Sequence, residues 1–125
     1  MILDTNALSA YLDRTAAAVE IISEASAIAI PVIVAGEFGY GIALSRHRDA
    51  YERSLQRMLD RSAVLDVDIE TARHYAAIRR ELRAAGTPIP ANDVWIAALS
   101  RQHAMSLMSR DSHFDLVGGL RRRTW

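Results

Sequence analysis

A chain of 125 residues, half of them hydrophobic, is long enough to bury a sizeable core and too apolar to be a disordered polypeptide. Fifteen acidic residues balance fifteen basic ones, all arginine, so overall charge does not steer the protein towards nucleic acid. No cysteine is present, which excludes disulfides and thiolate metal ligands and makes a cytoplasmic location the default expectation. The longest apolar run, over 27–35, is too short to span a membrane.

Short apolar runs alternate with helical patterns along the chain. In order, the sequence predicts a strand over 1–3, helices over 7–12 and from 15, a strand over 27–30, helices over 31–44 and 46–61, a strand over 63–67, helices over 68–86 and from 92, a strand over 106–109 and an edge strand over 120–125. This alternation favours a parallel sheet with helices on both faces. Without an internal repeat or a linker, one α/β domain is expected over 1–125.

Polar and special residues mark the expected helix boundaries. Asn6 and Asp68 are expected to cap the helices that follow them, and Pro31 suits the first turn of a helix. Three glycines fall within the helix that starts near Pro31: Gly36, Gly39 and Gly41. Because glycine weakens a helix, this run indicates either close backbone packing or an irregular helix.

Four acidic residues stand where the edge of such a sheet would gather them: Asp4, Glu37, Asp93 and Asp111. Asp4 directly follows the first strand and Asp111 follows the fourth. The carboxyl ends of parallel strands meet at the crevice where open α/β sheets bind ligands. Each acid also has an ordinary structural alternative, because acidic residues commonly cap helices, occupy turns or pair with arginine.

Glu37 departs furthest from those ordinary roles. Its neighbours are apolar residues and glycines, and no basic residue lies three or four positions away to pair with it. A carboxylate in such a setting is costly without compensation, and several close together repel one another. A cation is the natural counter-charge, and oxygen ligands suit Mg²⁺ or Mn²⁺ rather than zinc. The sequence therefore predicts a divalent-metal site.

The motifs around these acids resemble those of PIN domains and, within them, the VapC toxins of bacterial toxin–antitoxin pairs. The matching pieces are Met1-Ile2-Leu3-Asp4-Thr5-Asn6, Glu37 on an early helix, Pro90-Ala91-Asn92-Asp93-Val94-Trp95-Ile96-Ala97-Ala98, and Ser109-Arg110-Asp111-Ser112-His113-Phe114-Asp115. Their order and spacing agree with the family over the whole chain. The resemblance implies a single PIN domain over 1–125, a Rossmann-like α/β/α sandwich with a central parallel sheet. Pro31 departs from the pattern, near a position where serine or threonine is expected.

The same resemblance implies a metal-dependent endoribonuclease that hydrolyses structured RNA, such as a tRNA or a ribosomal RNA loop, and leaves a 3′-hydroxyl and a 5′-phosphate. In that family the residues matching the four acids surround one or two Mg²⁺ or Mn²⁺ ions and form the catalytic site. Four further residues are expected to position water, orient a carboxylate or add a ligand: Thr5, Asn6, Ser109 and Asp115.

Basic residues are expected to supply the contacts to RNA. The arginines best placed by sequence are Arg110, Arg14 and Arg46, whereas the cluster over 79–83 is interpreted as a solvated helix face. His47, His74 and His103 have no ligand spacing between them. His113, on a turn beside Phe114, is expected to pack or to lie at the surface rather than to take part in catalysis.

Two protein partners follow from the resemblance. A VapB-type antitoxin would lay its C-terminal segment across the crevice, where an arginine of that segment could replace the metal. A second copy of the chain would form a homodimer, or part of a higher-order toxin–antitoxin assembly, through the apolar faces of the helices over 7–25 and 32–44.

Three other functions compete with the ribonuclease. An aspartyl-phosphate phosphatase needs a second aspartate where Asn6 stands. A catalytically weak PIN-like module that only binds nucleic acid is disfavoured, because all four acids are present. A structure-specific DNA nuclease would share the metal chemistry, but such enzymes usually carry added helices for which this chain has no room.

Overall fold

The computed structural model describes residues 1–125 and contains one five-stranded sheet in which every strand is parallel to its neighbours. The spatial order of the strands is β3-β2-β1-β4-β5. Their bounds are β1 Ile2–Leu3, β2 Ala29–Pro31, β3 Ala63–Leu65, β4 Leu107–Met108 and β5 Arg122–Arg123. The parallel α/β architecture expected from the sequence is confirmed.

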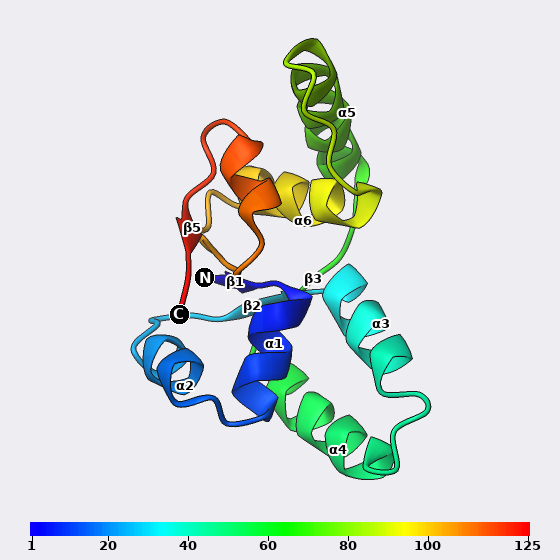
Figure 1. Ribbon diagram of the computed structural model, residues 1–125, viewed down its shortest axis with the longest axis vertical. Helices are drawn as coiled ribbons and strands as arrows, with labels where there is room; N and C mark the ends of the chain where they lie inside the picture. The colour runs from blue at the N-terminus through cyan, green and yellow to red at the C-terminus, as the bar shows by residue number, and fades with distance from the viewer.

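Helices cover both faces of this sheet. They are α1 Thr5–Leu12, α2 Ala16–Ser23, α3 Val32–Gly41, α4 Arg48–Leu59, α5 Ile69–Ala84, α6 Ala91–Gln102 and the short 3₁₀ helix η1 Ser112–Leu116. In Figure 1, α5, α6 and η1 lie on one side of the strands and α1 to α4 on the other, which makes an α/β/α sandwich. None of the helices is long and apolar enough to cross a membrane.

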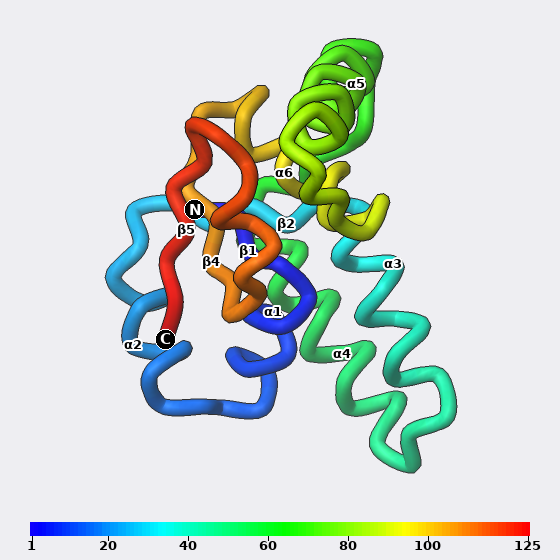
Figure 2. The backbone as a smooth tube through the Cα atoms, turned by 45° about the horizontal axis from the view of Figure 1, so that its top comes forward, coloured from blue at the N-terminus to red at the C-terminus, as the bar shows by residue number.

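The central strand of the sheet is β1, which lies beside β4 (Figure 2), and both strands are fully buried. Leu3 is in register with Met108, and the amide of Asp4 donates to the carbonyl of Met108 at 3.2 Å. The strand order changes direction between these two strands, because β2 and β3 extend the sheet on one side of β1 whereas β4 and β5 extend it on the other. Residues that follow β1 and β4 therefore face the crevice at this switch point.

The start of α1 differs from the prediction, because Asp4 rather than Asn6 is the cap. Asp4 retains the extended backbone of β1, with φ −82° and ψ 177°, and its carboxylate accepts a hydrogen bond from the amide of Ala7 at 2.7 Å. The helix consequently begins at Thr5, two residues earlier than expected. The predicted cap at Asp68 is confirmed, since its carboxylate accepts from the amide of Thr71 at 2.9 Å.

Several elements are shorter than predicted. Helix α3 ends at Gly41 instead of Leu44, and close backbone packing does not explain its glycines, since a β-carbon on any of the three would meet no atom within 4 Å. Helix α4 covers 48–59 rather than 46–61. The outer strands β3 and β5 have three and two residues, where five and six were expected. An edge strand has a partner on one side only, so less of the run is held in a ladder.

Candidate active site

All four predicted acids line one cleft of about 440 Å³, which we call the acid cleft. Asp4 comes from the end of β1, Glu37 from α3, Asp93 from the first turn of α6 and Asp111 from the loop between β4 and η1. The complete lining is Asp4, Thr5, Asn6, Glu37, Tyr40, Asn92, Asp93, Ile96 and Asp111. No arginine belongs to it, so its walls supply no permanent positive charge to the carboxylates.

Asp4 is the most deeply placed acid, with 4% of its surface exposed. Its two oxygens are both used: one accepts from the amide of Ala7 and the other from the hydroxyl of the fully buried Ser109. The Ser109 oxygen in turn accepts from the amide of Asp111 at 2.9 Å. Ser109 therefore orients a carboxylate, one of the roles expected of it from the sequence, and links Asp4 to the β4–η1 loop.

Burial controls the protonation of Asp4. Loss of water raises the pKa of its carboxyl from 3.8 to about 6. The hydrogen bonds from Ser109 and Ala7 pull the pKa down, whereas the negative charges of Asp111 and Asp93 raise it further. A positive charge bound in the acid cleft would lower the pKa of Asp4 and so offset the repulsion from Asp111 and Asp93.

Glu37 is held by neutral partners from two other segments. The hydroxyl of Thr5 donates to one carboxylate oxygen, and the side-chain amide of Asn92 donates to the other at 2.7 Å. These bonds satisfy the oxygens of Glu37 but leave its charge uncompensated. Asn92 is absent from the predicted site residues, although it directly precedes Asp93. Its partnership with Glu37 joins positions 55 residues apart, and a local sequence pattern does not reveal such a pair.

His113, expected to pack or to lie at the surface, is partly exposed, but it also contacts two acids of the cleft, which the sequence did not predict. Its Nδ1 is 3.0 Å from Oδ2 of Asp93 and 3.2 Å from Oδ1 of Asp111. Because ionised carboxylates only accept hydrogen bonds, Nδ1 must carry the proton in this arrangement. Burial raises the pKa of Asp93, which is an effect that His113 opposes and Asp111 reinforces.

These three side chains form a compact group that could hold a metal ion. Asp93, Asp111 and His113 each have one side-chain oxygen or nitrogen in this group, and these three atoms lie within 4.8 Å of one another. Asp111 is positioned by its turn, since its carboxylate also accepts from the backbone amide of His113 at 2.9 Å and so caps η1. The two carboxylates offer oxygen ligands that fit a divalent cation, while the protonated Nδ1 of His113 holds them in place rather than binding the ion.

Four other predicted contributors lie outside the acid cleft. Asp115 is exposed and pairs with Arg122 at 2.6 Å, so it adds no oxygen to the site. The arginines expected to contact RNA are all exposed and none lines the cleft: Arg110, Arg14 and Arg46. The guanidinium of Arg110 lies 4.7 Å from the centre of the Trp125 ring, which draws it towards the C-terminus. Asn6 does line the cleft.

Comparisons with known proteins agree with this fold. The family model of the PIN domain matches residues 1–120, and the chain is 30% identical to ribonuclease VapC2 of Haemophilus influenzae over 98% of its length and 96% of the relative's. The chain belongs to the PIN domain family, among the VapC ribonucleases. The tRNA(fMet)-specific endonuclease VapC of Shigella flexneri is 31% identical, over 71% of this PIN domain and 68% of that enzyme. The DNA-bound VapBC structure from Salmonella typhimurium matches with a TM-score of 0.87 and 25% identity, covering 99% of this PIN domain and 96% of that chain.

Arg122, the β5 residue that pairs with Asp115, also contacts the backbone of Ser109 in this PIN domain. Nη1 of Arg122 donates to the carbonyl of Ser109 at 3.0 Å, and the rest of its guanidinium holds Asp115 through two bonds. Replacing Arg122 by glutamine is expected to lower the free energy of unfolding, with loss of the Ser109 bond alone accounting for about 1 kcal/mol. Urea denaturation of both proteins measures the free energy of unfolding. Arg123→Gln, one position along at an exposed site, should change stability by less than about 0.5 kcal/mol; equal effects would exclude this role of Arg122.

Proposed function

We propose that this PIN domain is a divalent-metal-dependent endoribonuclease and acts as the toxin of a toxin–antitoxin pair. The observation that carries the proposal is the convergence of four carboxylates from four separate segments on one cleft that no arginine lines. Relatives named ribonuclease VapC support RNA as the substrate. The Shigella relative, named as specific for tRNA(fMet), makes a structured RNA such as a tRNA or ribosomal RNA loop the class to test first.

The ion is proposed to be Mg²⁺ or Mn²⁺, held by Asp4, Glu37, Asp93 and Asp111. A bound divalent ion would supply hydroxide from water near neutral pH and offset the charge of the scissile phosphate. The chain's own residues fix the ligands: the Ser109 hydroxyl orients Asp4, Thr5 and Asn92 orient Glu37, and His113 holds Asp93 next to Asp111. Such supporting contacts typically change metal affinity or activity 10- to 100-fold.

The reaction would be hydrolysis of a phosphodiester bond within the RNA chain. Water attacks phosphorus, the bond to the 3′-oxygen breaks, and a proton is taken up by that oxygen. The products are then a 3′-hydroxyl and a 5′-phosphate. No side chain of the acid cleft needs to form a covalent intermediate, because the nucleophile comes from water. Loops and unpaired ends suit such a site, since their bases can leave the stack and expose the backbone.

The proposed protein partner is a VapB-type antitoxin. The Salmonella neighbour is a VapBC complex, and the acid cleft of this chain would complement an arginine supplied by such a partner. A homodimer is proposed as well, through the face of α3 and the turn after it. Two large side chains are exposed there: Tyr40 has 87% of its surface accessible to solvent, and Leu44 is fully exposed.

Removal of metal is expected to abolish RNA cleavage completely. The full chain, purified without a partner, would be incubated with total cellular RNA in Mg²⁺, in Mn²⁺ and in EDTA, and the products mapped at their ends. Discrete products in either metal, with 5′-phosphates and none in EDTA, are the expected result. A single-stranded DNA of matched sequence serves as the control for nucleic acid type. Cleavage that continues in EDTA would exclude the proposed mechanism.

A further inference from the structure

A second cleft lies between α5 and the segment that leads into α6, and its charge is opposite to that of the acid cleft. It has a volume of about 630 Å³ and is lined by Arg79, Arg80, Leu82, Arg83, Pro88 and Ile89; we call it the arginine cleft. None of its three arginines forms an ion pair, whereas the arginines at 48, 73, 101 and 122 do. In a chain of zero net charge, three arginines without an ion pair lie within five residues and make a local positive surface, since the one acid among them, Glu81, pairs with Arg101.

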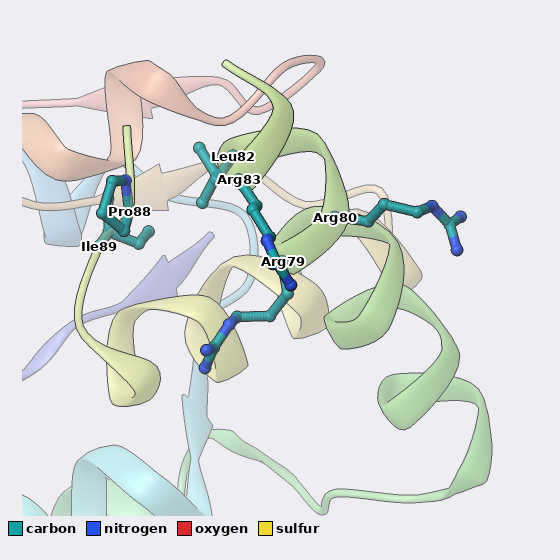
Figure 3. A pocket seen from close by; sticks show the side chains of 6 residues that line it. All are labelled: Arg79, Arg80, Leu82, Arg83, Pro88 and Ile89. Atoms are coloured by element: carbon teal, nitrogen blue, oxygen red, sulfur yellow. The ribbon is translucent and has the colours of Figure 1, made fainter. Parts of the chain in front are cut away.

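The cleft is a groove between two segments. Figure 3 shows Leu82 and Arg83 on α5 facing Pro88 and Ile89, which belong to the segment that leads into α6. Arg79 extends along the same side of α5 towards α6, and Arg80 extends from the helix in another direction. Two guanidinium groups thus line one groove with an apolar opposite wall, and a third lies beside it.

Arg79 is held in place by an aromatic stack. Its Nη1 donates to the hydroxyl of Tyr75 at 2.8 Å, and its guanidinium carbon lies 5.7 Å from the centre of that ring. The Tyr75 ring stacks on Trp95, with ring centres 4.0 Å apart and planes inclined by 24°. Trp95 belongs to α6, two residues after Asp93, so one helix carries both a site acid and the anchor of this arginine. A neutral phenol fixes the guanidinium without cancelling its charge, which leaves the arginine free to bind an anion.

The arginine cleft and the acid cleft are close along the chain. Ile89 lines one and Asp93 lines the other, and four residues span at most about 14 Å even when fully extended. The two linings therefore come within about 14 Å of each other at these residues, a separation that a short stretch of nucleic acid strand can span. The acid cleft cannot attract phosphates by itself because its lining is anionic, so cations for the flanking backbone have to come from a neighbouring surface.

We propose that the arginine cleft binds backbone phosphates of the RNA strand whose scissile bond lies in the acid cleft, an inference that rests on the proposed ribonuclease function. The planar guanidinium fork of arginine matches two oxygens of one phosphate. Leu82, Pro88 and Ile89 offer an apolar wall for a ribose or a base. This surface therefore contributes affinity and strand placement, while base identity is read elsewhere.

The test measures the salt dependence of RNA binding rather than cleavage. A fluorescein-labelled 12-nucleotide oligouridylate would be titrated with the full chain in EDTA, at KCl concentrations from 50 to 300 mM. Each phosphate contact to a single strand contributes about 0.7 to the slope of log affinity against log salt. The triple variant R79Q/R80Q/R83Q is expected to reduce that slope by about 2. R79K/R80K/R83K keeps the charges and is expected to keep most of the slope.

A matched control carries three substitutions at arginines on or just after α4, R53Q/R57Q/R61Q, which changes net charge equally. Equal slopes for the two glutamine variants would overturn the proposal, because the effect would then follow total charge alone. All three arginines of the cleft are exposed, so folding should be unchanged, which circular dichroism checks. Binding in EDTA is independent of catalysis. If the unmodified chain does not cleave RNA in Mg²⁺ or Mn²⁺, the proposed function is rejected. If R79Q/R80Q/R83Q leaves the salt slope of RNA binding unchanged, only this inference is rejected.

Discussion

Replacement of Asp93 by asparagine is expected to lower the rate of metal-dependent RNA cleavage by more than about 100-fold, because it removes a proposed charged metal ligand rather than a supporting contact. Asparagine preserves size and the start of α6, where no side-chain hydrogen bond of Asp93 caps the helix. The fold should therefore persist. The cleavage rate is measured under single-turnover conditions, with the enzyme in excess over one RNA that the unmodified protein cleaves. Asp66→Asn, at a loop position outside the acid cleft, is the matched control and should cleave at the unmodified rate.

A smaller and different loss is expected for His113→Ala. His113 contacts both Asp93 and Asp111, so its removal loosens two ligands without deleting either. We expect metal affinity to fall 10- to 100-fold, with most of the rate restored at saturating Mg²⁺ or Mn²⁺. A titration of rate against metal concentration separates this from the Asp93 variant, whose rate should stay low at any concentration. Equal, unrecoverable losses in both variants would instead give His113 a direct part in the chemistry.

The sequence is most informative where chemistry follows directly from chain position. Asp4 and Asp111 follow buried strands, and parallel strands deliver their ends to one edge, so the convergence of these two acids follows from strand order alone. Glu37 stands out through its apolar surroundings and the lack of a helical partner. Its true partners, Thr5 and Asn92, come from other elements and cannot be found by counting residues along α3.

The differences from the sequence predictions share a physical origin in tertiary contacts. His113 lies on a five-residue 3₁₀ helix with no periodic pattern, and only the packing of η1 against α6 brings its ring to Asp93. Asn6 and Asp4 are equally good capping residues by type. The extended backbone that Asp4 inherits from β1 decides between them. The arginines at 79–83 are exposed, as expected of a solvated helix face, but the sequence does not show the wall opposite them at Pro88 and Ile89, which a turn separates from the helix.

Asp4→Asn should stabilise the metal-free protein at pH 7.5 while destroying its activity, because the buried charge of Asp4 is costly to the fold. The pKa of Asp4 rises from 3.8 in the unfolded chain to about 6 in the fold. A difference of about two pKa units corresponds to roughly 3 kcal/mol at a pH where the carboxyl must be ionised in both states. Asparagine avoids that cost, and it caps a helix as well as aspartate does.

The direction of the pH dependence follows from which state holds the proton more tightly. Between about pH 4 and pH 6 the folded protein keeps Asp4 protonated and the unfolded chain does not, so stability falls as pH rises through this range. Below pH 3.8 both states are protonated and the contribution of Asp4 is fully recovered. Urea denaturation of both proteins in EDTA should therefore show Asp4→Asn more stable by about 1 to 3 kcal/mol at pH 7.5, with the difference shrinking at about pH 4.5.

Added metal should reverse the order of stability. A divalent ion that binds only the folded state stabilises it by about 2.7 kcal/mol at one hundred times its dissociation constant, and the unmodified protein has the stronger site. Asp4→Asn should gain much less from the same Mg²⁺ or Mn²⁺ concentration. If instead Asp4→Asn is the less stable protein at pH 7.5 in EDTA, the Asp4 carboxylate is already compensated within the fold. The electrostatic reason for a cation in the acid cleft would then be lost, because Asp4 is its most buried acid.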